Sequence, residues 1–422
     1  MAESSIYAPS RSYKMLLMIK GAEYTNDLVG IKITSSLATG YQIVVLTIRL
    51  TPQTVILEQL FGQDPIELTI SLIDQDESKI LEDMTFKLML LNSEFEIAVS
   101  EILTIDTQRD RATFNLVTVT RAPFQIMSAN TECLFSTAPG NEGDWFGNKT
   151  VKKMIEIIVD KFCPNAILEY DTDNVNESEI DQMFIPPTSM YKAIKLIDSN
   201  YGLYTGALAV FCDYKNSLKI MNLSERIKKN YTLWIEHLTT DHTEDDVTKS
   251  AYDNTYFYTY DNVYTNYVGN SRYGILGSTL NHIVLPSDHL YHVITHELND
   301  IFTEYGVLGS GGSTDFIDSK ASKRNSYYIE NNGDEYEETF AIAKMSRKLS
   351  DLSRVNLSVE RGLRIENLIR IGETVFFHTK TIEHQDLIGK YILYSSNLIW
   401  NKEGEWQTTA NLELIRSNRT IT

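Results

Sequence analysis

Val359-Glu-Arg-Gly-Leu-Arg-Ile-Glu-Asn-Leu-Ile-Arg-Ile-Gly-Glu-Thr-Val-Phe-Phe377 is the stretch that decides the fold class. It is followed by Leu387-Ile-Gly-Lys-Tyr-Ile-Leu-Tyr394, Trp400 and Thr408-Thr-Ala-Asn-Leu-Glu-Leu-Ile-Arg416. Apolar and polar residues alternate in short runs, and glycines interrupt the runs at positions 362, 372, 389 and 404. Alternation with a period of two is typical of half-buried β-strands. The C-terminal end therefore predicts a β-module.

The N-terminal part of the chain shows the same pattern. Its strand-like runs are Lys14-Met-Leu-Leu-Met-Ile19, Gln42-Ile-Val-Val-Leu-Thr-Ile-Arg-Leu50, Ile66-Glu-Leu-Thr-Ile-Ser-Leu-Ile73, Phe86-Lys-Leu-Met-Leu-Leu91 and Ala112-Thr-Phe-Asn-Leu-Val-Thr-Val-Thr120. Strands at this density, roughly five or six in about 110 residues, fit a small barrel or sandwich. The chain therefore has two similar β-modules, separated by a central region of mixed helix and strand. This organisation indicates a subunit of a ring-shaped assembly, not an enzyme built around a cleft.

The middle of the chain changes to helical spacing. Residues 148–162 carry an apolar stripe that predicts one helix, and residues 188–199 predict a second, amphipathic one. Their candidate N-caps are Asn148 or Thr150 and Thr188 or Ser189. Gly202 follows the second helix, where a left-handed residue is favoured. Between the two helices, residues 171–181 form an acidic, polar stretch that predicts a loop.

A hairpin and an irregular region follow. Leu208-Ala-Val-Phe-Cys-Asp213 and Leu218-Lys-Ile-Met-Asn-Leu223 predict a hairpin around a polar turn. Residues 240–345 are irregular, except that the nearly alternate tyrosines of 252–273 predict a strand with an aromatic face. Further predictions are helices over 287–302 and 338–352 and a Gly/Ser loop over 306–312.

Composition limits the classes of protein that fit. A chain of 422 residues predicts two to four domains, and 42% hydrophobic residues are enough for real cores. The net charge of −19 argues against a sequence-independent grip on nucleic acid, which needs a basic surface. The 24 tyrosines suit either interfaces or high β content. The three cysteines are widely spaced, so we expect buried, reduced thiols. Neither a signal peptide nor a membrane-spanning segment is expected.

One cluster could bind a metal. On a helix, His292 and His296 would share a face beside Glu297, and imidazoles on consecutive turns can bind zinc. The metalloprotease order His-Glu-x-x-His is absent, since Glu297 follows the last histidine. The alternative is a solvated or interface helix. Phosphate-binding loops and Gly-x-Ser-x-Gly elbows are also absent, so the sequence predicts no enzyme and no cofactor.

Three motifs in this order resemble one family. They are Phe184-Ile-Pro-Pro-Thr-Ser-Met-Tyr-Lys-Ala-Ile194, Asn200-Tyr-Gly-Leu-Tyr204, and the ending Leu387-Ile-Gly-Lys-Tyr-Ile-Leu393 with Leu412-Glu-Leu-Ile-Arg416. Together they resemble the central baseplate hub protein of contractile phage tails, which is related to the hub half of type VI secretion spikes. The resemblance implies an α+β, mainly β fold with two similar tube-type β-barrel domains and an inserted mixed α/β region.

The resemblance also implies a domain arrangement. It divides the chain into an N-terminal arm at 1–12, a first tube-type domain at 13–121, a mixed α/β domain at 122–204, a second tube-type domain at 205–240 and 345–418, and an irregular insertion with a helix at 241–344. The insertion becomes a candidate interface region, because tyrosine is favoured at interfaces. Its candidate contact residues are Tyr256, Tyr258, Tyr260, Tyr264 and Tyr267.

The function implied is structural. Such a hub is a homotrimer that adapts a hexameric tail tube to a trimeric central spike and lines the DNA channel. Its partners would be the spike, the tail tube or tube-initiator protein, wedge proteins, the tape measure protein, and genomic DNA in transit without specific binding. It would be part of the virion and be assembled in the host cytoplasm. The alternatives are another tube-end, wedge or secretion-system component, or a metal-dependent hydrolase.

Overall fold

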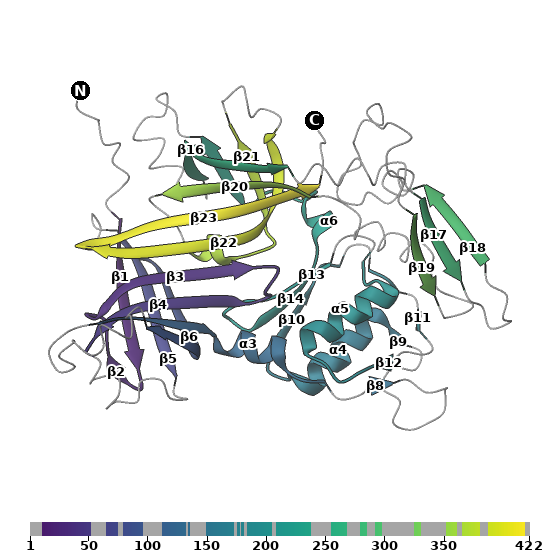
Figure 1. Ribbon diagram of the computed structural model, residues 1–422, viewed down its shortest axis with the longest axis horizontal. Helices are drawn as coiled ribbons and strands as arrows, with labels where there is room; N and C mark the ends of the chain where they lie inside the picture. Colours follow the sequence, from purple (N-terminus) through teal and green to yellow (C-terminus); the bar gives the residue numbers. More distant parts are fainter. Residues whose placement is uncertain are drawn as a thin grey trace.

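The computed structural model shows two β halves, a helical part and a small separate sheet (Figure 1). The residues that the structure describes are 11–51, 65–74, 79–95, 112–131, 134–135, 149–172, 175–177, 179–180, 184–204, 208–237, 255–267, 279–284, 292–297, 325–330, 352–360, 365–379 and 387–417. The predicted mainly β fold with some helix is confirmed.

The first half is a run of antiparallel strands. Its members are β1 (Arg11–Ile19), β2 (Ala22–Glu23), β3 (Leu28–Ser36), β4 (Gln42–Leu50), β5 (Ile66–Asp74), β6 (Lys79–Phe95) and β7 (Ala112–Thr120). They pair in the order β2-β1-β5-β6-β7-β4-β3. Strand β4 buries every second residue, as its period-two sequence predicts. The five strand-like runs of the N-terminal module are therefore confirmed.

The second half forms a closed cycle of strands. Its members are β15 (Leu233–His237), β16 (Thr255–Tyr267), β20 (Leu352–Glu360), β21 (Thr374–His378), β22 (Gly389–Glu403) and β23 (Glu405–Ser417). Pairing runs β22-β21-β15-β16-β20-β23 and returns to β22 through the long β22–β23 hairpin. Among the described residues, pairing in the first half does not return on itself in this way.

The two halves meet at a seam between β3 and β22. Seven residue pairs join these antiparallel strands, from Ser395 opposite Ser36 to Asn401 opposite Gly30. Trp400 is fully buried at this seam, and its ring meets Tyr13 of β1 edge-on at 6.0 Å. One hydrophobic core runs through both halves. The halves are therefore packed as one body, and they lie against each other in Figure 1.

The helical part packs around a second core. Its elements are α3 (Arg121–Ser128), β8 (Leu134–Phe135), β9 (Lys149–Thr150), α4 (Val151–Phe162), β10 (Ile167–Tyr170), β11 (Glu179–Ile180), β12 (Phe184–Ile185), α5 (Met190–Tyr201), β13 (Leu208–Cys212), β14 (Ser217–Asn222) and α6 (Leu223–Arg226). Thr150 caps α4 and Ser189 caps α5, so one candidate in each pair is confirmed. Gly202 follows α5 with φ +71°, also as expected.

The predicted hairpin β13–β14 exists, but it does not join the second cycle. It pairs with β10 in a separate sheet. All five residues of β13 are buried. Ala209 and Phe211 belong to the core of the β halves, whereas Leu208 and Val210 belong to the helical core. The hairpin therefore separates the two cores, which differs from its expected place within a tube-type domain at 205–240.

Several other predictions were wrong. Residues 292–297 of the predicted helix over 287–302 form strand β18 (His292–Glu297), which pairs with β17 (Thr279–Val284); β17 also pairs with β19 (Asn325–Glu330). The β-branched run Val293-Ile-Thr295 favours a strand, and cross-strand pairing overrides the helical spacing. Within the C-terminal alternating stretch, residues 365–369 form helix α11 (Ile365–Ile369). The Gly/Ser loop predicted over 306–312 and residues 338–351 of the helix predicted over 338–352 lie outside the described residues, so these two predictions are not tested.

Within residues 241–344, the strand predicted over 252–273 is confirmed as β16, and β17, β18 and β19 are further strands in a region otherwise expected to be irregular. Strand β16 lies in this region and pairs with β15 and β20, so it is a full member of the second cycle. The physical reason is its alternating aromatic sequence, which suits a sheet with a buried face. The other described strands of this region, β17, β18 and β19, form a separate three-stranded sheet at the right of Figure 1.

Candidate functional site

The tyrosines chosen as interface candidates lie on β16. Tyr256 is only 5% exposed and belongs to the core, where its hydroxyl accepts a hydrogen bond from Asn367 Nδ2 at 3.4 Å. It is therefore a core residue of this chain. Tyr258, Tyr264 and Tyr267 are register partners of Val359, Asn356 and Ser353 on β20. The side chains of Tyr258, Tyr260, Tyr264 and Tyr267 lie outside the described part of the structure.

The candidate metal ligands lie on β18. Residues four apart on a strand are separated by about 13 Å along its axis. His292 and His296 therefore lack the shared helical face on which the metal hypothesis rested. The side chains of His292, His296 and Glu297 are not among those described. Elsewhere, the described residues contain no group of three or more His, Cys, Asp or Glu residues placed to hold a metal ion.

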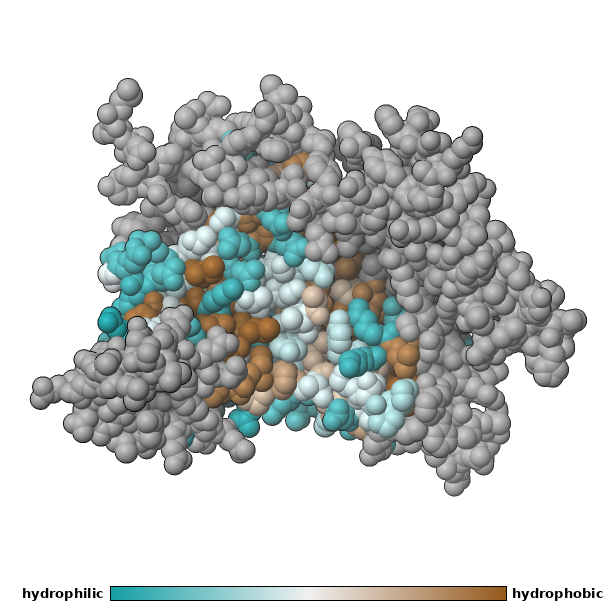
Figure 2. All heavy atoms as spheres, viewed as in Figure 1, coloured by the Kyte–Doolittle hydropathy of each residue, from teal (hydrophilic) through white to brown (hydrophobic). Residues whose placement is uncertain are grey.

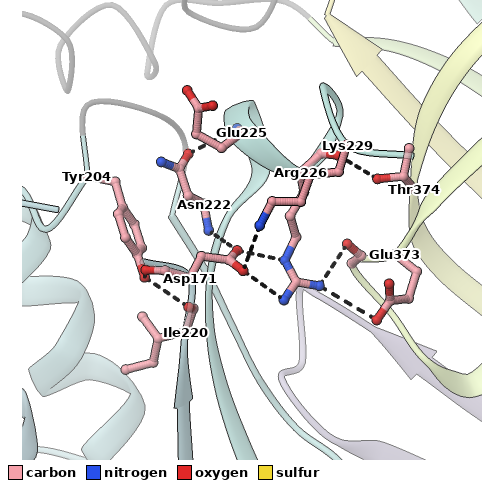
Figure 3. Close-up of polar contacts among 10 residues, drawn as sticks. Asp171, Tyr204, Ile220, Asn222, Glu225, Arg226, Lys229, Glu373 and Thr374 are labelled. Atoms are coloured by element: carbon pink, nitrogen blue, oxygen red, sulfur yellow. Dashed lines mark hydrogen bonds and ion pairs between the residues drawn. The ribbon is translucent and has the colours of Figure 1, made fainter. Parts of the chain in front are cut away.

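A cluster of hydrogen bonds and ion pairs lies where the helical part meets the second half (Figure 3). Asp171 follows β10 directly, and Arg226 is the last residue of α6. The side-chain oxygen of Asn222 caps α6 by accepting from the N–H of Glu225. This cap fixes the short helix, and the helix directs Arg226 toward Asp171. Local sequence therefore positions both charges of the site.

Arg226 holds Asp171 with two hydrogen bonds. Its Nε donates to Oδ2 at 2.7 Å and its Nη2 donates to Oδ1 at 3.2 Å. The backbone N–H of Asn222 donates to Oδ2 at 2.9 Å, and Lys229 Nζ lies 3.7 Å from Oδ1. Asp171 is only 8% exposed. Two-point contact between guanidinium and carboxylate is the strong form of this interaction, so the buried charge is well compensated.

The same arginine reaches across to the second half. Its Nη1 donates to the carbonyl of Gly372 at 3.4 Å and lies 3.7 Å from Glu373 Oε1. The hydroxyl of Thr374 at the start of β21 donates to the carbonyl of Arg226 at 2.6 Å. Gly372 has φ +86°, and an added Cβ would lie 2.5 Å from Met221 Sδ. The site therefore joins β10, α6 and β21 through hydrogen bonds and ion pairs. The packing around Gly372 is too tight to accept a Cβ atom.

Tyr204 completes the site from the end of α5. Its hydroxyl lies 2.9 Å from the carbonyl of Asp171 and 3.0 Å from that of Ile220 and donates toward both. Burial raises the pKa of Tyr204, and the Asp171 charge raises it further. The hydroxyl therefore stays protonated and acts as a donor. We name Asp171, Tyr204, Arg226 and Glu373 the polar junction; its saturated contacts suit a rigid joint.

The thiols fit a structural role. Cys163 and Cys212 are buried and free, as expected, and Cys133 lies outside the described residues. Burial raises the pKa of both thiols. A buried thiol with a raised pKa is a poor nucleophile. These two cysteines therefore act as small core residues.

Sequence reasoning missed the polar junction. Residues 171–181 were read as an acidic loop, and Arg226 carried no assignment. One signal was present: Asn222 followed by Glu225 has the spacing of a helix-start motif and could have predicted α6. The pairing of Asp171 with Arg226 had no local signal.

Comparisons with solved structures identify the fold. The tail protein from Neisseria meningitidis MC58 matches with a TM-score of 0.55 and 10% identity, over 96% of this chain and 97% of that one. The 43 kDa tail protein of prophage MuSo2 from Shewanella oneidensis matches with a TM-score of 0.53 and 12% identity, over 96% and 98%. The resemblance to phage tail proteins inferred from the sequence is confirmed at the level of the fold.

Sequence comparisons add a family. No curated protein matches the chain. In the part of the chain that the structure describes, no helix is long and apolar enough to cross a membrane. The model of the family described as Bacteriophage PBS1 gene 109 protein matches residues 73–284, which is half of the chain. The protein is therefore a member of the Bacteriophage PBS1 gene 109 protein family.

Proposed function

We propose that this protein is the structural hub of a contractile phage tail baseplate. As a homotrimer, it adapts a hexameric tail tube to a trimeric central spike. The observation that carries the proposal is the likeness in fold to two phage tail proteins over almost the whole of all three chains. A match of this extent includes both β halves and the helical part.

The arrangement of the β halves supports the symmetry role. The second half closes a cycle of six strands, and the first half contributes six long strands joined to it at the β3–β22 seam. We propose that the two halves act as equivalent wall segments, the tube-type domains expected from the sequence. Three copies would then present six segments to a sixfold neighbour and a threefold face to the spike.

The charge of the chain suits a conduit for DNA. A net charge of −19 repels phosphate and favours passage over binding. We therefore propose that genomic DNA passes through the ring without specific contacts. The other proposed partners are the spike, the tail tube or tube-initiator protein, wedge proteins and the tape measure protein. The protein would be found in the virion after assembly in the host cytoplasm.

The polar junction gives the proposal a mechanical basis. An adaptor must keep its tube-facing and spike-facing parts in a fixed relative orientation. Asp171 holds Arg226 in place within the helical part. The same arginine is bonded to the second half, since its Nη1 donates to the carbonyl of Gly372 and its carbonyl accepts from the hydroxyl of Thr374 on β21. Directed polar contacts specify one geometry more strictly than apolar packing does. We propose that the junction holds the helical part at a constant angle to the ring.

Sedimentation equilibrium of the purified chain tests the proposal. The expected mass is three times the monomer mass of 48.2 kDa. Added spike protein should join this species without changing its threefold stoichiometry. A mass of six chains, or an assembly without a ring, would point instead to a tube-end or wedge component. A chain that stays monomeric and joins neither spike nor tube would rule out the hub role.

A further inference from the structure

A row of polar residues crosses the seam between the two β halves. Ser396 on β22 is the register partner of Ser35 on β3, and Ser35 is the register partner of Gln42 on β4. The hydroxyl of Thr120 at the end of β7 extends the row by donating to Gln42 Oε1 at 3.2 Å. Residues directly opposite each other on antiparallel strands have their side chains on the same face of the sheet. These four residues are named the seam row.

The seam row faces the interior of the protein. Ser35, Gln42 and Ser396 are fully buried, and Thr120 is 2% exposed. The residues two positions along β22, β3 and β4 share this face and are fully buried apolar residues: Leu398, Ile33 and Val44. The seam row is therefore a polar end of the hydrophobic core that the two halves share.

The outward face of the sheet has a different arrangement at the same place. Thr34 and Asn397, one position away from Ser35 and Ser396, are also register partners across the seam. The hydroxyl of Thr34 donates directly to Asn397 Oδ1 at 2.7 Å. Both residues are partly exposed, and Figure 2 shows hydrophilic and hydrophobic residues side by side over the region of β3 and β22. Polar groups on the outward face can therefore pair with each other or with solvent.

Three atoms of the seam row have no such partner. Ser35 Oγ, Ser396 Oγ and Gln42 Nε2 make no hydrogen bond to any other group of the described residues. A buried polar group without a partner destabilises a fold, and native structures rarely contain one. Three such atoms on adjacent strands indicate a shared partner that lies between them.

The chemistry of the three atoms identifies this partner. The amide nitrogen of Gln42 can only donate, whereas each serine hydroxyl can donate or accept. A cation could not accept the proton from Nε2, and the seam row contains no charge to compensate a buried anion. Water accepts and donates, and a buried water typically makes about three hydrogen bonds. The small side chains of Ser35 and Ser396 leave more room than Ile33 and Leu398 do in the neighbouring row.

We propose that the seam row binds an ordered water molecule, which accepts from Gln42 Nε2 and makes hydrogen bonds with the hydroxyls of Ser35 and Ser396. Ser396 belongs to the second half, whereas Ser35 and Gln42 belong to the first, so the water joins the two halves. It also specifies the register of the seam. A shift of β22 by two residues would place Leu398 opposite Ser35 and leave the polar atoms unpaired.

Removing the serine hydroxyls tests the site by urea denaturation. With water bound, Ser35→Ala removes one of its three partners and should raise the equilibrium constant of unfolding about fivefold. Ser396→Ala should have a similar effect. Without water, the same substitutions would remove an unpaired buried hydroxyl and would lower the constant. The sign of the change therefore distinguishes a bound water from unpaired hydroxyls.

Ser395→Ala is the matched control on the same strand. The hydroxyl of Ser395 is partly exposed and donates to Glu413 Oε2 at 3.0 Å, outside the seam row. Its removal should change the unfolding constant by less than about threefold, as for other surface substitutions.

A crystal structure at a resolution that shows ordered water tests the site directly. The expected result is a water molecule within hydrogen-bond distance of Ser35 Oγ, Ser396 Oγ and Gln42 Nε2. The proposal is overturned if the three atoms pack against apolar side chains with no water between them. It is also overturned if either alanine variant of the seam row leaves the unfolding constant unchanged or lowers it.

Discussion

Arg226 is the residue on which the joint between the helical part and the second half depends. Asp171 lies 55 positions before it in the sequence, and Gly372 lies 146 positions after it. Contacts this distant leave no periodic or motif signal in a single sequence. The helix caps Thr150 and Ser189 could be predicted because a cap acts on the next three residues. The polar junction could not, because its pairing exists only after the chain has folded.

Replacing Arg226 tests the joint at the residue scale. Arg226→Met removes the counter-charge of a buried carboxylate and should lower the free energy of unfolding by about 3–5 kcal/mol. Lys153→Met is the matched control, because Lys153 pairs with Glu156 at the surface. It should cost less than about 1 kcal/mol. Urea denaturation measures both values. Similar small losses in the two variants would show that the junction does not hold the parts together.

Gly372 provides a second residue-scale test. Gly372→Ala adds a Cβ against Met221 and places alanine at positive φ. Gly21 has a similar φ of +79° but open space around it, so Gly21→Ala measures the backbone cost alone. That cost is about 1–2 kcal/mol, and the clash at Gly372 should add about 1–3 kcal/mol. Equal losses of unfolding free energy in the two variants would contradict the tight packing inferred at this site.

At the scale of elements, regular periodicity predicted the structure well. Helices α4 and α5 and strand β4 follow their apolar spacing, because each buries one face against a core. The prediction failed for residues 292–297, where a strand pairs on one side with β17. It also missed α11, a helix too short to show a period. Pairing with the neighbouring strand β17 fixes residues 292–297 as a strand, and the spacing of apolar residues within that segment does not encode this pairing.

One contact between elements should depend on pH. Glu366 of α11 accepts from Lys215 in the β13–β14 turn at 3.1 Å and also contacts Arg370. Burial tends to raise the pKa of Glu366, but hydrogen bonds from Lys215 and Arg370 outweigh it and hold the pKa below its ordinary 4.5. A lowered pKa contributes stability above the ordinary pKa, and that contribution is lost as pH falls through the lowered pKa.

Glu366→Gln should therefore reduce the acid sensitivity of the fold. Because Glu366 is partly exposed, the difference in unfolding free energy between neutral and acidic pH should shrink by less than about 1 kcal/mol. Lys215→Met removes one donor and should reduce the same difference. Unfolding curves at pH 7 and at pH 3 give the values. If the difference in unfolding free energy between pH 7 and pH 3 is unchanged in both variants, the contact of Glu366 with Lys215 does not contribute to the pH dependence of stability.

At the scale of the whole molecule, the two β halves share a core. The sequence predicted two similar β-modules, but strand order is a long-range property that alternation does not encode. The seam is the clearest case, since β3 and β22 meet although they lie at opposite ends of the chain. Their contact makes the halves one body, and the hairpin β13–β14 of the helical part lies between the core of this body and the helical core.

The shared core predicts cooperative unfolding of the halves. Trp400 is fully buried at the seam and contacts Tyr13 of the first half. Trp400→Ala should cost about 3–5 kcal/mol, as for other buried aromatic residues. In scanning calorimetry both halves should lose stability together, in one shifted transition. Two transitions, of which only one shifts, would show that the halves are independent.

The direct test of the hub is an electron-microscopy average of the purified protein viewed along its symmetry axis. The proposed function predicts a ring with threefold symmetry and six lobes, because each of three copies contributes two β halves. Alternate lobes should differ in outline, since among the residues that the structure describes the strand cycle closes in the second half and not in the first. A ring of six identical chains, or particles of a single chain, would contradict it.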